Sequence, residues 1–244
     1  AIVLNGLQHG VYIVDAVHSQ RLVAGTHGIA RPGGSALNAG QVGALRAALY
    51  IAKHTRASAE ETAFADILNQ ALAKHQKFKE HTLKNDDNAD ALIAKVRKQM
   101  SISGAAIRDI ASMKQTLSQT VTAMKSIEND CGTGKEKCLY KAYQYRDTLV
   151  CQIVCLIAMI DYAQTACSTQ GSALYRNANG ILRNGLDEGF RFIPDKMANN
   201  DKIQYGNWNN GNCSMKWRAV RSLPDSMEVF ETVWRSFREN QNIY

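Results

Sequence analysis

The sequence predicts a mainly α-helical protein of the α+β class: a short N-terminal β and glycine-loop segment, a three-helix bundle and a C-terminal extension. Apolar residues recur at three-to-four spacing through the middle of the chain, as in amphipathic helices. Only 3 prolines occur in 244 residues, so long helices are permitted almost everywhere. A composition of 45% hydrophobic and 21% charged residues excludes a disordered chain. We expect domain boundaries at 1–55, 56–172 and 173–244.

The N-terminal segment is rich in glycine and β-branched residues. Ile2–Leu4 and Val11–Val14 predict short buried strands. Residues 25–34 hold too many glycines for a regular element. Ser35 is a good N-cap, and a helix is expected from Ala36 to Lys53.

The middle of the chain predicts three long antiparallel helices joined by short connections. The first runs from about Ser58 to the polar stretch at 84–88. The second would run unbroken to the glycine turn at 130–134, because residues from Leu92 to Met124 keep one helical face. The third spans roughly Cys138 to Cys167 and carries the most apolar run, so it should be the buried member.

The C-terminal extension reads as mostly irregular. The stretch rich in Asn and Gly at 177–185 predicts irregular structure, and the one at 199–212 predicts an exposed loop. Residues 214–220 alternate in polarity and predict a strand. Residues 225–240 predict a terminal helix whose aromatic stripe docks it on the protein.

Charge and hydropathy exclude two classes of partner. The chain has 29 basic and 22 acidic residues, a net charge of +7, but the basic residues are scattered rather than clustered. Nucleic-acid binding is therefore not expected. No membrane span is expected either, because the longest charge-free apolar stretch, Thr148–Ile160, is shorter than the roughly 20 residues a bilayer needs.

The 6 cysteines form no Cys-x-x-Cys pair, and every histidine lies upstream of them, so no metal site is predicted. Cys151 and Cys155 fall within the apolar run, as small core residues do. We expect reduced thiols in an intracellular protein, cytoplasmic or alternatively mitochondrial. Residues Ala1–Leu4 predict no signal peptide.

The most informative segment is the glycine loop that leads into the helix capped by Ser35. The first turn of such a helix presents free backbone amides and a partial positive charge, which suit an anion or an electron-rich acceptor. Arg31 lies four residues before the cap, where its guanidinium could bind a carboxylate through two hydrogen bonds. His27 lies in the same loop. A glycine turn with a solvated arginine explains the local pattern equally well.

This segment resembles the C-terminal flavin-binding motif of the fumarate reductase/succinate dehydrogenase flavoprotein family, a His-Gly-x-x-Arg-x-Gly stretch that runs into a helix. His27, Gly28, Arg31 and Gly33 match it in order. The resemblance implies an FAD cofactor and a small carboxylate substrate, with Arg31 and His27 in the catalytic site. It also implies flavin contacts from a short run of residues: Gly28, Gly33, Gly34, Ser35, Ala36 and Leu37.

The chain departs from the family pattern in ways that bear on function. No Gly-x-Gly-x-x-Gly fingerprint occurs, and residues 19–22 offer no acid before the motif. Gln170 stands where the helical domain of the family commonly has an arginine. The resemblance thus implies about half of a flavoenzyme: residues 1–55 would end the FAD-binding domain, and a bundle would follow.

Two functions stay open. The chain could be one part of an FAD-dependent oxidoreductase acting on CH–CH bonds, with its N-terminal half supplied by another chain or a precursor and electrons passed by a further subunit. Alternatively, it could be a non-catalytic docking subunit derived from that family. The missing acid near Gln20 favours the second, and the retained Arg31 favours the first.

Overall fold

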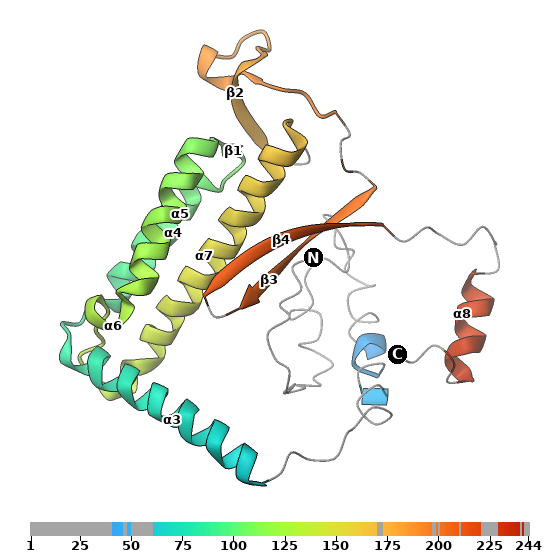
Figure 1. Ribbon diagram of the computed structural model, residues 1–244. Coiled ribbons are helices and arrows are strands. Elements are labelled where there is room, and N and C mark those ends of the chain that lie inside the picture. The colour runs from blue at the N-terminus through green and yellow to red at the C-terminus, as the bar shows by residue number, and fades with distance from the viewer. Residues whose placement is uncertain are drawn as a thin grey trace. The chain divides into compact units, whose positions relative to one another are not determined.

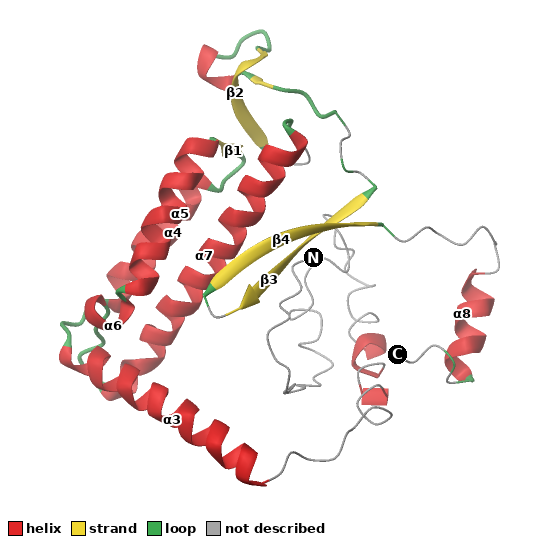
Figure 2. Cartoon of the chain, in the orientation of Figure 1, coloured by secondary structure: helices red, strands yellow, loops and turns green. Residues whose placement is uncertain are grey.

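The computed structural model describes residues 41–45, 48–49, 61–169, 173–196, 199, 201–209, 211–220, 229–239 and 241. The chain divides into two compact units. Within the described residues, long helices dominate and the sheets are small (Figure 2). The predicted mainly α, α+β fold class is confirmed.

The bundle consists of three helices packed against one another: α4 (Ala89–Ser103), α5 (Ile110–Lys125) and α7 (Leu139–Ala166). They run in alternating directions, with α5 antiparallel to the other two (Figure 1). The C-terminal end of α3 (Glu61–Lys84) lies against α7 and the short helix α6 (Ile127–Asp130), while its N-terminal half extends beyond the bundle.

The prediction of one unbroken second helix is wrong, because α4 and α5 form a hairpin. The amide of Gly104 donates to the Met100 carbonyl at 2.8 Å and ends α4. Asp109 begins α5, its Oδ1 accepting the Ser112 amide at 2.8 Å. Between them Ile107 takes part in a short strand instead of a helical face. Apolar spacing alone cannot distinguish a long helix from two helices joined by a turn of suitable length.

The core forms two clusters, and α7 contributes to both. Leu149 belongs to the cluster near the start of α7, and Leu156 belongs to the cluster near its end. Both side chains are fully buried, which confirms that the apolar run marks the central helix. Burial of a leucine side chain stabilises a fold by roughly 1.5–3 kcal/mol. The bundle therefore depends on α7.

Two small sheets accompany the helices. Strand β1 (Ile107–Arg108) pairs in parallel with β2 (Leu174–Ile181). Strands β3 (Lys202–Asn209) and β4 (Asn212–Ala219) form a second pair, with a turn that places Gly211 at a φ of +85°. The strand expected at 214–220 is confirmed. The irregular structure expected at 177–185 and the loop expected at 199–212 are wrong in large part, since β2 and β3 occupy much of them.

Two further helices fall inside predicted ones. Residues 41–45 and 48–49 are helical, within the helix expected at Ala36–Lys53. Helix α8 (Val229–Arg238) lies within the terminal helix expected at 225–240. The described helical residues fall within the expected ranges because N-caps, glycines and apolar periodicity are local signals.

One helical stretch in the described part of the chain, Glu136–Ala166, is long and apolar enough to cross a membrane by length and composition alone. Of its most apolar window, 44% is buried inside the protein. The central helix of a globular bundle passes the same test. The expectation of no membrane span therefore stays a prediction.

Candidate functional site

Every residue that the sequence assigns to a site lies outside the described residues. This set comprises His27, Gly28, Arg31, Gly33, Gly34, Ser35, Ala36 and Leu37. The structure describes the helix that follows them only at residues 41–45 and 48–49. There Ala44 is buried, while Val42 and Leu45 are exposed.

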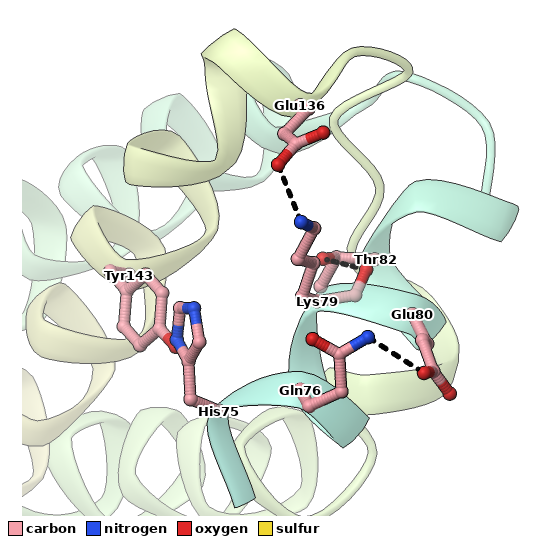
Figure 3. A network of polar contacts seen from close by, with 7 residues as sticks. All are labelled: His75, Gln76, Lys79, Glu80, Thr82, Glu136 and Tyr143. Carbon is pink, nitrogen blue, oxygen red and sulfur yellow. Dashed lines mark hydrogen bonds and ion pairs between the residues drawn. The ribbon is translucent and has the colours of Figure 1, made fainter. Parts of the chain in front are cut away.

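A polar junction joins α3 to α7 and to the short 3-10 helix Glu136–Cys138 that precedes it, and sequence reasoning missed it (Figure 3). Nδ1 of His75 and the hydroxyl of Tyr143 are hydrogen-bonded, and their rings stack with centroids 5.7 Å apart. Lys79, one turn further along α3, forms an ion pair with Glu136 at 2.5 Å. The hydrogen bond from Lys79 holds the pKa of Glu136 below its usual value. The four-residue spacing of His75 and Lys79 places both on one helical face, but their partners cannot be inferred from spacing.

A shallow hollow of about 480 Å³ lies along the outer face of α7, next to this junction. Tyr143, Asp147 and Cys151 are among its lining residues. The guanidinium of Arg146 lies 4.8 Å from the Tyr143 ring centroid and donates to the Asp147 carboxylate at 2.9 Å. The arginine and the aspartate therefore neutralise each other beside the hollow.

A second hollow of about 460 Å³ surrounds the turn between α4 and α5. Arg108 and Arg176 both line it. Arg108 is already engaged, because its Nη1 donates to the Tyr175 hydroxyl at 2.7 Å and its Nε donates to the Ala105 carbonyl at 2.7 Å. Arg108 therefore fixes β1 against β2, and nothing in its geometry requires a ligand.

In the described part of the chain, every thiol or phenol whose pKa is shifted has a raised pKa. A raised pKa disfavours the deprotonated, reactive form. Burial raises the pKa of Cys131 to about 11 and that of Tyr162 to about 12. Burial also raises the pKa of Cys155 and of Cys213. A nucleophilic cysteine needs the opposite shift, because the thiolate is the reactive species. All 6 cysteines are free of disulfides.

The described residues hold no group of three His, Cys, Asp or Glu side chains that could bind a metal ion. Their polar clusters serve packing: Lys79 and Glu136 fasten α3, and Lys141 pairs with Asp90 at 2.5 Å between α7 and α4. The hypothesis of redox chemistry therefore depends on the N-terminal motif around Arg31 and not on the bundle.

Comparison with known proteins gives a weak likeness to solved structures. No protein-family model and no curated protein sequence matches the chain. Among solved structures, it resembles the E. coli quinol fumarate reductase subunit FrdA with the E245Q mutation, at 17% identity and a TM-score of 0.47. The match covers 80% of this chain and 30% of that one, so the chain spans less than a third of the length of FrdA. No residue role is transferred from a likeness of this strength.

Proposed function

We propose that the chain is part of an FAD-dependent oxidoreductase of the fumarate reductase/succinate dehydrogenase type. It would support hydride transfer between the flavin and an unsaturated or saturated carboxylate. One observation carries the proposal: the ordered motif His27-Gly28-x-x-Arg31-x-Gly33, directly before a helix capped by Ser35.

The structure offers two points of support. Residues 41–45 and 48–49 are helical, as required of a helix whose first turn approaches the flavin. A bundle of α4, α5 and α7 follows in the chain order that the resemblance implies.

In this proposal the chain supplies binding and orientation. Bound FAD would accept or donate the hydride. The backbone from Gly33 to Leu37 would face the flavin, because glycines permit close approach and the first amides of the helix are free to donate. Arg31 would hold the substrate carboxylate by two charge-assisted hydrogen bonds, with His27 beside it.

The given sequence lacks the motif by which dinucleotide-binding domains hold the pyrophosphate of FAD. It contains no Gly-x-Gly-x-x-Gly fingerprint, and residues 19–22 provide no carboxylate before the motif. We therefore propose that a partner chain or a precursor provides the N-terminal half of the flavin domain, and that a further subunit carries electrons.

The second candidate is a non-catalytic docking subunit derived from the same family. The specific observation in its favour is that Gln20 and Arg21 stand in the region where the family places a flavin-binding glutamate. Such a subunit would keep the bundle and lose the cofactor.

A visible absorption spectrum of the protein purified from its native source tests the proposal. Oxidised flavin should absorb in the blue, bleach on addition of dithionite and release FAD on denaturation. Chains that co-purify, identified by mass spectrometry, should include one that carries the missing fingerprint. A colourless preparation with no such chain would contradict the oxidoreductase and favour the docking subunit.

A further inference from the structure

Helix α3 carries an apolar face that no described residue of its own unit covers. Six of its residues define what we term the α3 stripe: Phe64, Ile67, Leu68, Ala71, Leu72 and His75. The large apolar side chains Phe64, Ile67, Leu68 and Leu72 are exposed by 60%, 54%, 44% and 54%. At 3.6 residues per turn the stripe spans an arc of about 140°. Continuous exposed apolar surface of this kind marks an interaction site.

The same helical face is buried further along the helix. Phe78 and Thr82 continue the stripe, and both side chains are buried where α3 meets the bundle. The Thr82 hydroxyl donates to the Phe78 carbonyl at 3.0 Å, so it brings no unpaired polar group into that contact. The face is thus built for packing along its length, but the bundle covers only its C-terminal end (Figure 1).

We propose that the α3 stripe is the interface of a homodimer in which two copies of α3 pack antiparallel. The intervals between stripe residues are 3, 1, 3, 1 and 3, and they read the same in either direction. An antiparallel second copy therefore presents the same pattern, as a two-fold interface requires. Leu68 would face Ala71 of the second copy, where the small alanine permits close approach.

The ends of the stripe match in the same register. Phe64 would lie against His75 of the second copy, and Ile67 against its Leu72. His75 is held by its stack on Tyr143, so Phe64 of the second copy would meet a fixed ring. Aromatic pairs in such contacts are stabilising beyond their buried area.

Charge along α3 favours the antiparallel direction. Within the overlap that this register gives, Glu61 and Asp66 lie in the first turns of α3, whereas Lys74 and Lys77 lie in its second half, Lys77 also pairing with Glu128 at 3.1 Å. An antiparallel pair places the acidic half of each helix beside the basic half of the other, and it also opposes the two helix dipoles. A parallel pair would place like charges side by side.

The area is sufficient for a specific contact. The exposed surface of the α3 stripe is on the order of 500 Å² per copy. The dimer would therefore bury about 1,000 Å² in total, which is the size at which specific interfaces begin. The proposal does not depend on flavin binding.

Sedimentation velocity of the purified full chain over a concentration series tests the dimer. The parent should sediment as a dimer. Leu68→Glu should weaken dimerisation by at least about 100-fold, because the two-fold axis places two buried glutamates in each dimer. Ile102→Glu is the matched control: Ile102 is 65% exposed on α4, away from the stripe, and its replacement should leave the dimer intact. Far-ultraviolet circular dichroism should show parent-like helix content in both variants.

A charge-swap pair tests the register. Leu68→Glu and Ala71→Lys should each be monomeric alone. An equimolar mixture should form heterodimers, since the carboxylate introduced in one copy then faces the ammonium group introduced in the other. A monomeric parent at every concentration would overturn the proposal, as would a dimer that survives Leu68→Glu or a mixture that stays monomeric. A different protein that co-purifies with the parent and is lost with Leu68→Glu would also overturn it. The proposed flavin-domain partner, in contrast, should remain bound to Leu68→Glu.

Discussion

Asn88 and Gly132 exchange hydrogen bonds across 44 residues and thereby join two turns of the bundle. Oδ1 of Asn88 accepts the Gly132 amide at 2.9 Å, and the Gly132 carbonyl accepts the amides of Asn88 and Ala89, each at 3.1 Å. The side-chain amide of Asn85 adds bonds to the carbonyls of Glu128 and Cys131, both at 3.0 Å. The turn between α3 and α4 is therefore fastened to the turn that precedes α7.

Gly132→Ala should destabilise the protein by about 2–4 kcal/mol, as measured by urea unfolding. A Cβ at this position would lie 2.1 Å from the Asp86 carbonyl oxygen and 2.6 Å from the Asn85 carbonyl carbon. Both are backbone atoms, so the turn itself must move. Gly189→Ala is the control, because a Cβ there meets nothing within 4 Å. Equal unfolding midpoints for the two variants would contradict the interlocked turns.

Gln152→Met should raise the free energy of unfolding by about 1 kcal/mol. Gln152 is only 3% exposed in the middle of α7, and neither of its amide atoms has a hydrogen-bond partner in the part of the chain that the structure describes. Methionine has nearly the same shape and removes the unpaired polar atoms. Gln144→Met, at a more accessible position of the same helix, should change stability by less than about 0.5 kcal/mol. A loss of stability in Gln152→Met would show that the amide has a polar partner.

Iodoacetamide at a pH of about 8, close to the ordinary pKa of a thiol, should modify Cys151 and Cys167 but leave Cys131 unmodified until the protein unfolds. The first two are exposed, whereas Cys131 is fully buried and its pKa is raised from 9.0 to about 11. Peptide mass spectrometry of native and urea-unfolded samples measures the difference.

The raised pKa of Cys131 also predicts that the folded protein loses stability at alkaline pH. The folded state binds the Cys131 proton more tightly than the unfolded state does, so its contribution is complete below pH 9.0 and is lost as the pH rises towards about 11. Cys131→Ser should flatten this part of the pH profile of unfolding. An unchanged profile would assign the alkaline transition to other groups.

Arg31→Lys, assayed in the assembled native complex, tests whether Arg31 binds the substrate carboxylate through two hydrogen bonds. Lysine keeps the positive charge but lacks the planar guanidinium that donates two parallel hydrogen bonds to a carboxylate. Turnover on a panel of unsaturated dicarboxylates should therefore fall by about 100-fold or more, while the flavin content is retained. Arg183→Lys, at an exposed position, should change neither quantity. Full activity in Arg31→Lys would show that Arg31 does not bind the substrate carboxylate, and would favour the interpretation of Arg31 as a solvated surface residue.

Local signals predicted the long helices well. The apolar run around Val154 indicated the buried α7, and the polar stretch at 84–88 indicated the end of α3. The hairpin between α4 and α5 escaped prediction because Ile107 and Ile110 continue the helical spacing through the turn. Only Gly104 and the capping Asp109 signalled the break, and both residues also occur within helices.

The strands were harder to predict than the helices. Asparagine and glycine are depleted in strands, so residues 199–212 read as a loop. In the structure, β3 pairs with β4 through backbone hydrogen bonds. The partner is the next strand in the chain, since β3 ends at Asn209 and β4 begins at Asn212. Composition alone therefore failed here because strand formation depends on pairing, which can outweigh the low strand propensity of single residues.

The sequence by itself determined most of the helical segments, which helix is the most apolar, and that a glycine motif with Arg31 precedes the bundle. Each of these follows from spacing and residue type within a few turns of chain. Only the tertiary structure decided where the chain reverses after Gly104, that His75 meets Tyr143, and that the described residues cover the apolar face of α3 at one end alone. The reversal depends on α4 and α5 packing against each other, and the other two features depend on contacts between residues far apart in sequence. The free energy of such contacts is set by how whole helices pack together.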